Sequence, residues 1–260
     1  MIRRRSFLLA LALALALCAA CSTLPEGQRA TKPASGPPEI QEETVEEHAA
    51  QFDEEEPDRP AGSQDELAAS VYIVAHLTDA GYVSRLDAVP VEDLVRSTNV
   101  VGLAPSGEEP EAIVVVGYDT GEGTDTGGYS ISTWLEVARA LRAIEPEHDV
   151  QFVALGAEHA TVEGGDLGSR RLAQQLLDDG HTPHVVVVEG VEGGDDTLMV
   201  GGDAREELIE EARSLGVGRD TSYPRKDMGA AFLAAGFDTT VIGGAAGAVG
   251  PVLLAYLAGL

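Results

Sequence analysis

The chain has 260 residues, 44% of them hydrophobic, which is enough for one full core and too little for a large multidomain assembly. Its 44 acidic and 17 basic residues give a formal net charge of -27 at pH 7. Because so acidic a surface repels phosphate, we expect a solvated acidic face and no nucleic-acid partner.

The first twenty residues predict an export signal, with a basic start and an apolar run from Phe7 to Leu17. The end of this segment resembles the bacterial lipobox, which implies that Cys21 takes a lipid and becomes the mature N-terminus. We therefore expect a lipid-anchored protein of the cell envelope, on the extracytoplasmic side, that contacts the membrane through Cys21. A plain secretory signal is the alternative. A spanning anchor is disfavoured, since the apolar run is shorter than the roughly 18 residues that a spanning helix needs.

Residues 21–62 predict a disordered tether, because they are rich in proline, glutamate and glycine and lack a sustained apolar period. A helical turn around Val45 to Phe52 is the only regular structure expected there. Ser63 is a suitable N-cap, with Glu66 three residues later. Apolar residues then recur at helical spacing, at Leu67, Val71, Val74 and Leu77. The folded domain is therefore predicted to span 63–260.

From residue 64 the predicted helices and strands alternate in a way typical of an α/β fold. Continuous apolar runs such as AIVVVG and HVVVVEG suit a three-layer arrangement, in which a mostly parallel twisted sheet carries helices on both faces. In chain order the expected elements are helix 64–80, strands 82–88, 99–104 and 112–118, helix 127–144, strand 149–156, helix 166–179, strands 184–189 and 197–201, helices 204–214 and 228–235, strand 239–242 and helix 247–259.

Four stretches, taken in order, resemble the co-catalytic zinc aminopeptidases. This family includes bacterial leucyl aminopeptidase, aminopeptidase Y, glutamate carboxypeptidase and the transferrin-receptor ectodomain. The stretches are AHLTDAGY with STNVVGLAPSG, VVVGYDTGEGTDTGGYSISTWLEVARAL, VQFVALGAEHATVEGGDLGSR and VVVVEGVEGG. The resemblance covers about 63–243. It implies two zinc ions about 3.5 to 4 Å apart that activate a water, with a carboxylate as general base.

The first two ligand positions of the family are altered here. A histidine is usual two residues before Asp119, and that position is Gly117. The aspartate that bridges the two ions aligns with Thr126, while Asp125 falls one residue too early. A neutral hydroxyl is a poor bridge between two dications.

The remaining positions are partly kept. Glu158 occupies the place of the general base, and His159 replaces a glutamate ligand. Glu189 stands where the family has an aspartate ligand, and Tyr223 matches a tyrosine on the substrate side. The fifth ligand, a late histidine, is missing, since no histidine follows His184. The resemblance therefore implies a degenerate metal site.

Three readings of the polar residues stay open. Asp119 and Asp125 can serve as turn residues, because aspartate bonds the backbone in strand-to-helix loops. Alternatively, Asp119, Asp125, His159 and Glu189 hold a single residual cation. In the third reading, Glu158 and His159 form an acid/base pair. A serine hydrolase is disfavoured because the Gly-x-Ser-x-Gly elbow is absent.

Our leading hypothesis is an exported lipoprotein whose aminopeptidase-like domain is catalytically inactive, binds no cofactor, and acts as a binding or scaffold module for a peptide or an envelope protein. The fold alone does not guarantee catalysis. The alternative is an active zinc-dependent aminopeptidase or peptide hydrolase, which uses altered ligands with Glu158 as general base. In that case zinc is the cofactor.

Overall fold

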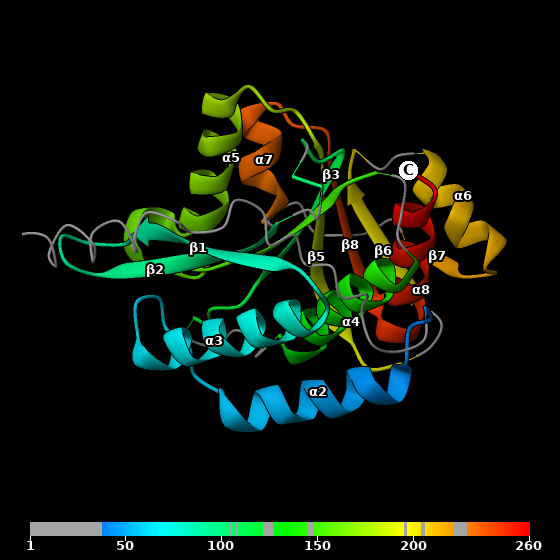
Figure 1. Cartoon of the computed structure of the whole chain (residues 1–260), viewed down its shortest axis with the longest axis horizontal. Coiled ribbons are helices and arrows are strands. Elements are labelled where there is room, and N and C mark those ends of the chain that lie inside the picture. Colours follow the sequence, from blue (N-terminus) through cyan, green and yellow to red (C-terminus); the bar gives the residue numbers. More distant parts are fainter. Residues whose placement is uncertain are drawn as a thin grey trace, which may run out of the picture. The chain divides into compact units, whose positions relative to one another are not determined.

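The apolar runs of the sequence form the centre of a sheet in the computed structural model (Figure 1). The structure describes residues 38–103, 106–107, 109–121, 127–144, 148–194, 197–203, 206–220 and 228–260. All of these belong to one compact unit, Lys32–Leu260. The predicted signal, Cys21 and the first part of the predicted tether lie outside the described residues.

The sheet order among the described strands is β1-β2-β4-β3-β5-β8-β6-β7. Its centre, β4-β3-β5-β8, is parallel as predicted, whereas β1, β2 and β6 each run antiparallel to a neighbour. The strands are β1 Val83–Pro90, β2 Arg96–Leu103, β3 Ala112–Gly117, β4 Val150–Leu155, β5 His184–Glu192, β6 Thr197–Gly202, β7 Gly218–Asp220 and β8 Thr239–Ala245.

Helices cover both faces of the sheet, which confirms the predicted three-layer α/β fold (Figure 1). The helices are α2 Glu42–Glu55, α3 Gln64–Asp79, α4 Gly128–Ile144, α5 Leu167–Asp179, α6 Glu206–Ser214, α7 Gly229–Ala235 and α8 Ala246–Ala258, with a short 3-10 helix at Val162–Gly164. Side chains of α3, α4, α6 and α8 fill one core cluster, and α5 and α7 fill the other. Among the described helices, none is long and apolar enough to cross a membrane.

Strand β5 shows why the centre of the sheet is so apolar. Successive side chains of a strand point to opposite faces. Val186 and Val188 accordingly join one core cluster, while Val185 and Val187 join the other. Both faces are covered, so the strand needs an unbroken apolar run rather than an alternating one.

The predicted tether is wrong for residues 42–62, because the chain is already folded there. Helix α2 buries Val45, Ala49 and Phe52, which recur at helical spacing, and it packs against α4. Arg59 is also fully buried, with its guanidinium over the Phe52 ring at 4.5 Å. A short apolar stripe within an acidic segment is therefore enough to dock a helix on the domain.

The predicted core face of α3 is also partly wrong. Leu77 is buried as expected, but Leu67 and Val71 are 56% and 60% exposed. The face that packs on the sheet instead presents Ala69 and Ile73 with Leu77. Helix α3 therefore carries a second apolar stripe, which no described part of the domain covers.

Candidate functional site

Asp119 follows strand β3, Glu158 and His159 follow β4, and Glu189 lies within the last part of β5. Loops at the carboxyl ends of such strands commonly form ligand sites. A cavity of about 200 Å³ opens at this edge. Its lining residues are Val116, Gly117, Asp119, Gly127, Ser130, His159, Val188, Glu189, Gly190 and Met228.

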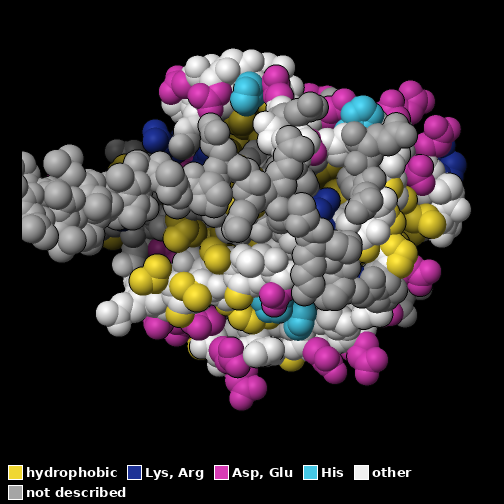
Figure 2. Space-filling view, in the orientation of Figure 1, with side chains coloured by type: hydrophobic (Ala, Val, Ile, Leu, Met, Phe, Trp, Pro, Cys, Tyr) yellow, Lys and Arg dark blue, Asp and Glu magenta, His cyan; other side chains and the backbone are white. Residues whose placement is uncertain are grey.

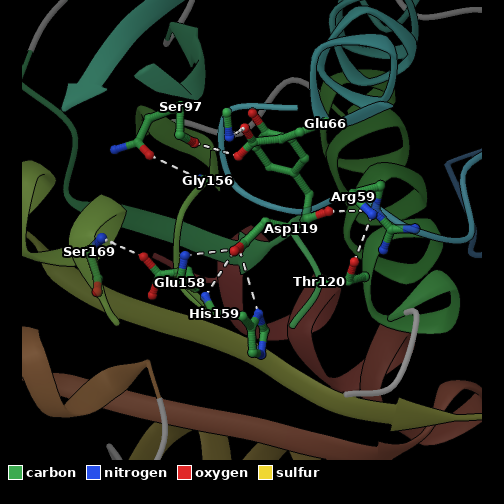
Figure 3. A network of polar contacts seen from close by, with 12 residues as sticks. Arg59, Glu66, Ser97, Asp119, Thr120, Gly156, Glu158, His159 and Ser169 are labelled. Carbon is green, nitrogen blue, oxygen red and sulfur yellow. Dashed lines mark hydrogen bonds and ion pairs between the residues drawn. The ribbon is translucent and has the colours of Figure 1, made fainter. Parts of the chain in front are cut away.

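Asp119 connects the ends of two neighbouring strands (Figure 3). Its Oδ1 accepts a hydrogen bond from the backbone N–H of Glu158 at 2.9 Å, and its Oδ2 accepts one from the backbone N–H of His159 at 2.8 Å. The carboxylate side chain is 0% exposed. Each oxygen therefore already holds a backbone donor of the loop that follows β4, which is the role of a turn residue.

His159 lies beside this carboxylate, with its Nδ1 3.6 Å from Asp119 Oδ1. The hydrogen bond to Asp119 raises the pKa of His159, against the opposing effect of burial. Its side chain is 39% exposed and lines the cavity. Asp119 thus favours the protonated form of His159 more than water does for an ordinary histidine.

Glu158 points toward Ser169 in the first turn of α5 (Figure 3) and does not line the cavity. Its Oε1 accepts a hydrogen bond from the backbone N–H of Ser169 at 2.7 Å. The other oxygen, Oε2, is buried and has no hydrogen-bond partner within the described residues. Burial raises the pKa of Glu158 to about 8, so the carboxyl group is mostly neutral at pH 7.

Met228 fills the place where the family has its first histidine. A side chain built on Gly117 would put its Cβ 2.9 Å from Met228 Sδ and 3.6 Å from Glu158 Cγ. The backbone N–H of Met228 also donates to Glu189 Oε2 at 3.3 Å. Met228, which precedes α7, thus packs against Gly117 and donates a hydrogen bond to the Glu189 carboxylate of β5.

The described residues do not fit the zinc pair that the resemblance implies. Gly117 offers no ligand atom, and both oxygens of Asp119 already accept backbone hydrogen bonds. Within the described ranges, no group of three or more His, Cys, Asp or Glu side chains could hold a metal ion. The structure brings Asp119, His159 and Glu189 to one cavity, while Asp125 and Tyr223 lie outside the described residues.

A second and larger cavity, of about 450 Å³, lies on the other side of His159. His159 lines both cavities. The lining of the larger one is mostly apolar, with acidic groups at Asp58 and Glu92. It consists of Asp58, Pro60, Ala61, Val91, Glu92, Val95, Thr120, Gly121, His159, Ala160, Thr161 and Val162.

Arg59 supports this region and was missed in the sequence, where it falls in the predicted tether. Its backbone N–H donates to Thr120 Oγ1 at 2.7 Å, and its Nε donates to the backbone oxygen of Tyr118 at 2.6 Å (Figure 3). Burial lowers the pKa of Arg59, and the carboxylates of Asp53 and Asp119 oppose that effect. The backbone and the guanidinium of Arg59 therefore hold the loop after β3 through Thr120 and Tyr118.

Two further buried polar groups were also missed as site residues. Glu66, expected only as part of a capping box, is buried and accepts hydrogen bonds from the Ser97 hydroxyl and from the backbone N–H of Gly62. Burial raises the pKa of Glu66 to about 7. Asn99 accepts from the N–H of Gly156 at 3.1 Å and donates to the oxygen of Gly168 at 3.0 Å. The sequence signal that could have identified this buried polar cluster is the presence of Ser97 and Asn99 in the otherwise apolar strand STNVVG.

The two buried glutamates predict a stability that falls as the pH rises. The ordinary pKa of each is 4.5, while the folded values are about 7 for Glu66 and about 8 for Glu158. The folded state therefore keeps protons that the unfolded state has lost between about pH 4.5 and 8. Urea unfolding should show a loss on the order of 6 kcal/mol from pH 5 to pH 8, with the larger share from Glu158.

Glu66→Gln and Glu158→Gln should each flatten this slope, because glutamine does not titrate. Glu54→Gln, at an exposed position of α2, is the matched control and should leave the slope unchanged. A slope that persists in both buried variants would show that these carboxyl groups are ionised in the folded protein.

Comparison with known proteins gives the family and the fold. No curated protein matches the sequence. One similar solved structure is a leucine aminopeptidase precursor from Bacteroides thetaiotaomicron, with a TM-score of 0.70 and 14% sequence identity over 86% of this chain and 99% of that chain. Another is a Fimbriiglobus ruber glutaminyl cyclase, with a TM-score of 0.70 and 17% identity over 88% of this chain and 98% of that chain. A B. thetaiotaomicron glutaminyl cyclase bound to N-acetylhistamine is also similar, with a TM-score of 0.68 and 14% identity over 86% of this chain and 100% of that chain. Residues 99–229, half of the chain, match peptidase family M28, and the chain therefore belongs to peptidase family M28.

Proposed function

We propose that this member of peptidase family M28 binds peptides without hydrolysing them. The observation that carries the proposal is the packing at Gly117, where Met228 sulfur stands in the space that a ligand side chain would need. Asp119 adds to it, since both of its oxygens hold backbone N–H groups rather than facing a shared point. The family's zinc-dependent chemistry has no described donor set here.

Glu158 does not supply a general base in this arrangement. It is absent from the lining of both cavities described above. Its Oε1 accepts a hydrogen bond from the backbone N–H of Ser169 in the first turn of α5. Glu158 thus keeps the family's general-base position in the sequence, while its buried side chain hydrogen-bonds to the start of α5.

The cavities favour a peptide with a free amino terminus. Their linings combine apolar side chains with the carboxylates of Asp58, Glu92 and Glu189. The formal net charge of -27 adds long-range attraction for a cationic ligand. Glu189 is half-buried beside Val188 and Met228, so a bound ammonium would meet a carboxylate in a partly desolvated place.

Isothermal titration with tripeptides that carry a free amino terminus tests this function. We expect binding that is lost with N-acetylated counterparts, and no released product by mass spectrometry. Glu189→Gln should weaken binding about tenfold, the effect of removing roughly 1.4 kcal/mol of charge-assisted bonding. Glu192→Gln, on the same strand but exposed, is the matched control.

Two results would contradict this function. Chelator-sensitive release of an N-terminal residue, or cyclisation of an N-terminal glutaminyl peptide, would show an active metalloenzyme instead. Equal affinity of free and acetylated peptides for the chain, or no affinity for either, would remove the binding role assigned to the acidic cavities.

We also propose that the domain is held at the extracytoplasmic face of the cell envelope by a lipid on Cys21. The support is the sequence of the first 21 residues, with its basic start, its apolar run and its small residues before the cysteine. Replacing Cys21 with serine should move the chain from the membrane fraction to the soluble fraction. Retention of this variant in the membrane fraction would contradict a lipid anchor at that residue.

A further inference from the structure

Strand β1 forms one end of the sheet and leaves a row of backbone groups unpaired. It pairs with β2 on one side, and no described segment pairs with its other side. The hydrogen bond from Val91 N to Val95 O fixes which groups face β2. Hydrogen-bonding direction alternates along an antiparallel strand, so Ser84, Leu86 and Ala88 turn their N–H and C=O groups outward.

An apolar patch lies beside this open edge. Leu86 is 52% exposed, and Leu67 and Val71 of α3 are exposed to a similar extent. Leu86 is paired with Val100, whose side chain lies in the same core cluster as the sheet-facing side of α3. Paired residues share a face, so Leu86 projects on the side of the sheet that α3 covers.

The exposed stripe of α3 faces the same edge. Tyr72 and His76, on the opposite flank of the helix, contact Phe52 and His48 of α2. Helix α2 packs on α4, toward the middle of the sheet. The flank with Leu67 and Val71 is therefore turned toward β1, and Figure 2 shows hydrophobic side chains gathered between α3 and the β1–β2 hairpin.

The sequence of β1 is self-complementary about Leu86. Residues 83–89 read VSRLDAV, so an antiparallel copy with Leu86 opposite its own counterpart also places Arg85 opposite Asp87. Ser84 then lies opposite Ala88, and these are the residues that turn their backbone groups outward. Small or apolar side chains meet on the α3 side, and opposite charges meet on the other side.

We propose that a second copy of this chain binds the β1 edge, in a two-fold antiparallel pairing centred on Leu86. Leu86 exchanges both backbone hydrogen bonds with its counterpart, and the two sheets become continuous. Strands in a sheet lie about 4.8 Å apart, so the two α3 helices flank the axis on one face at about packing distance. Leu67 and Val71 are then buried against their counterparts.

Charge and symmetry favour a second copy over an unrelated strand. In the isolated chain, Arg85 and Asp87 pair with each other along the strand, at 2.7 Å between Nη2 and Oδ2. The pairing with a second copy offers each of them an opposite charge across the interface. An interface on a two-fold axis must be self-complementary, which a surface selected for another partner need not be.

Light scattering after size exclusion, over a range of concentrations of the full chain, tests the proposal. We expect the mass of a dimer for the wild type and of a monomer for Leu86→Pro. The Leu86 N–H points outward, so proline there leaves the hydrogen bonds to β2 intact. Circular dichroism shows whether this variant is folded.

A charge exchange gives a second test that does not depend on proline. Arg85→Asp places like charges across the axis and should raise the dissociation constant at least about tenfold. Adding Asp87→Arg restores opposite charges and should restore the dimer. A wild-type monomer at all concentrations, or a dimer that is insensitive to Leu86→Pro and to Arg85→Asp, would overturn the proposal.

Cross-linking tests the register. With Cys18 and Cys21 replaced by serine, Leu86→Cys should form a disulfide between copies, because hydrogen-bonded partners have Cα atoms about 5.5 Å apart. Ser84→Cys should not cross-link by itself, and should do so when Ala88→Cys is present. A monomer that dimerises only after deletion of residues 22–37 would instead assign the edge to the chain's own N-terminal segment, and would also overturn the proposal.

Discussion

The hydrogen bonds of the Asp119 carboxylate to the N–H groups of Glu158 and His159 hold the candidate site in its present form. They join the loop after β3 to the loop after β4, and they turn His159 toward the cavities while Glu158 faces α5. A buried carboxylate needs such donors, because an unpaired charge is costly away from water. Each carboxylate oxygen thus has one backbone donor from the loop after β4.

The residues around this carboxylate fit the packed arrangement. Met228 covers Gly117, and its backbone N–H holds the Glu189 carboxylate. Arg59 supports the loop from behind through Tyr118 and Thr120. The architecture of a catalytic edge is thus retained, while its polar groups bond to the protein itself. The proposed peptide binding depends on the two cavities at this edge.

The sequence predicted the fold well where one physical signal dominated. Unbroken valine runs identified β3 and β5 as strands buried on both faces. It failed where a short pattern competed with composition. The stripe of Val45, Ala49 and Phe52 was too brief to outweigh the acidic, proline-rich segment around it, so a single helical turn was expected where the 14-residue helix α2 forms. For α3, spacing alone could not show which of two apolar stripes faces the sheet.

The structure brings Asp119, His159 and Glu189, which the sequence singled out, to one cavity, but their contacts were not predictable. Gly117 and Thr126 already indicated an altered metal site, whereas the covering by Met228 depends on a residue more than a hundred positions away. Partners so distant in sequence are fixed by tertiary packing, which a single sequence does not encode locally. The buried positions of Glu66, Asn99 and Arg59 were hidden for the same reason.

Zinc content, measured by elemental analysis on the wild type beside Asp119→Asn, tests most directly whether this carboxylate serves structure or metal. We predict no bound zinc in either protein. Asp119→Asn should lower the free energy of unfolding by about 1 to 3 kcal/mol, since an amide cannot accept both backbone bonds. Two equivalents of zinc in the wild type, lost in Asp119→Asn without a change in stability, would contradict the structural role of the Asp119 carboxylate.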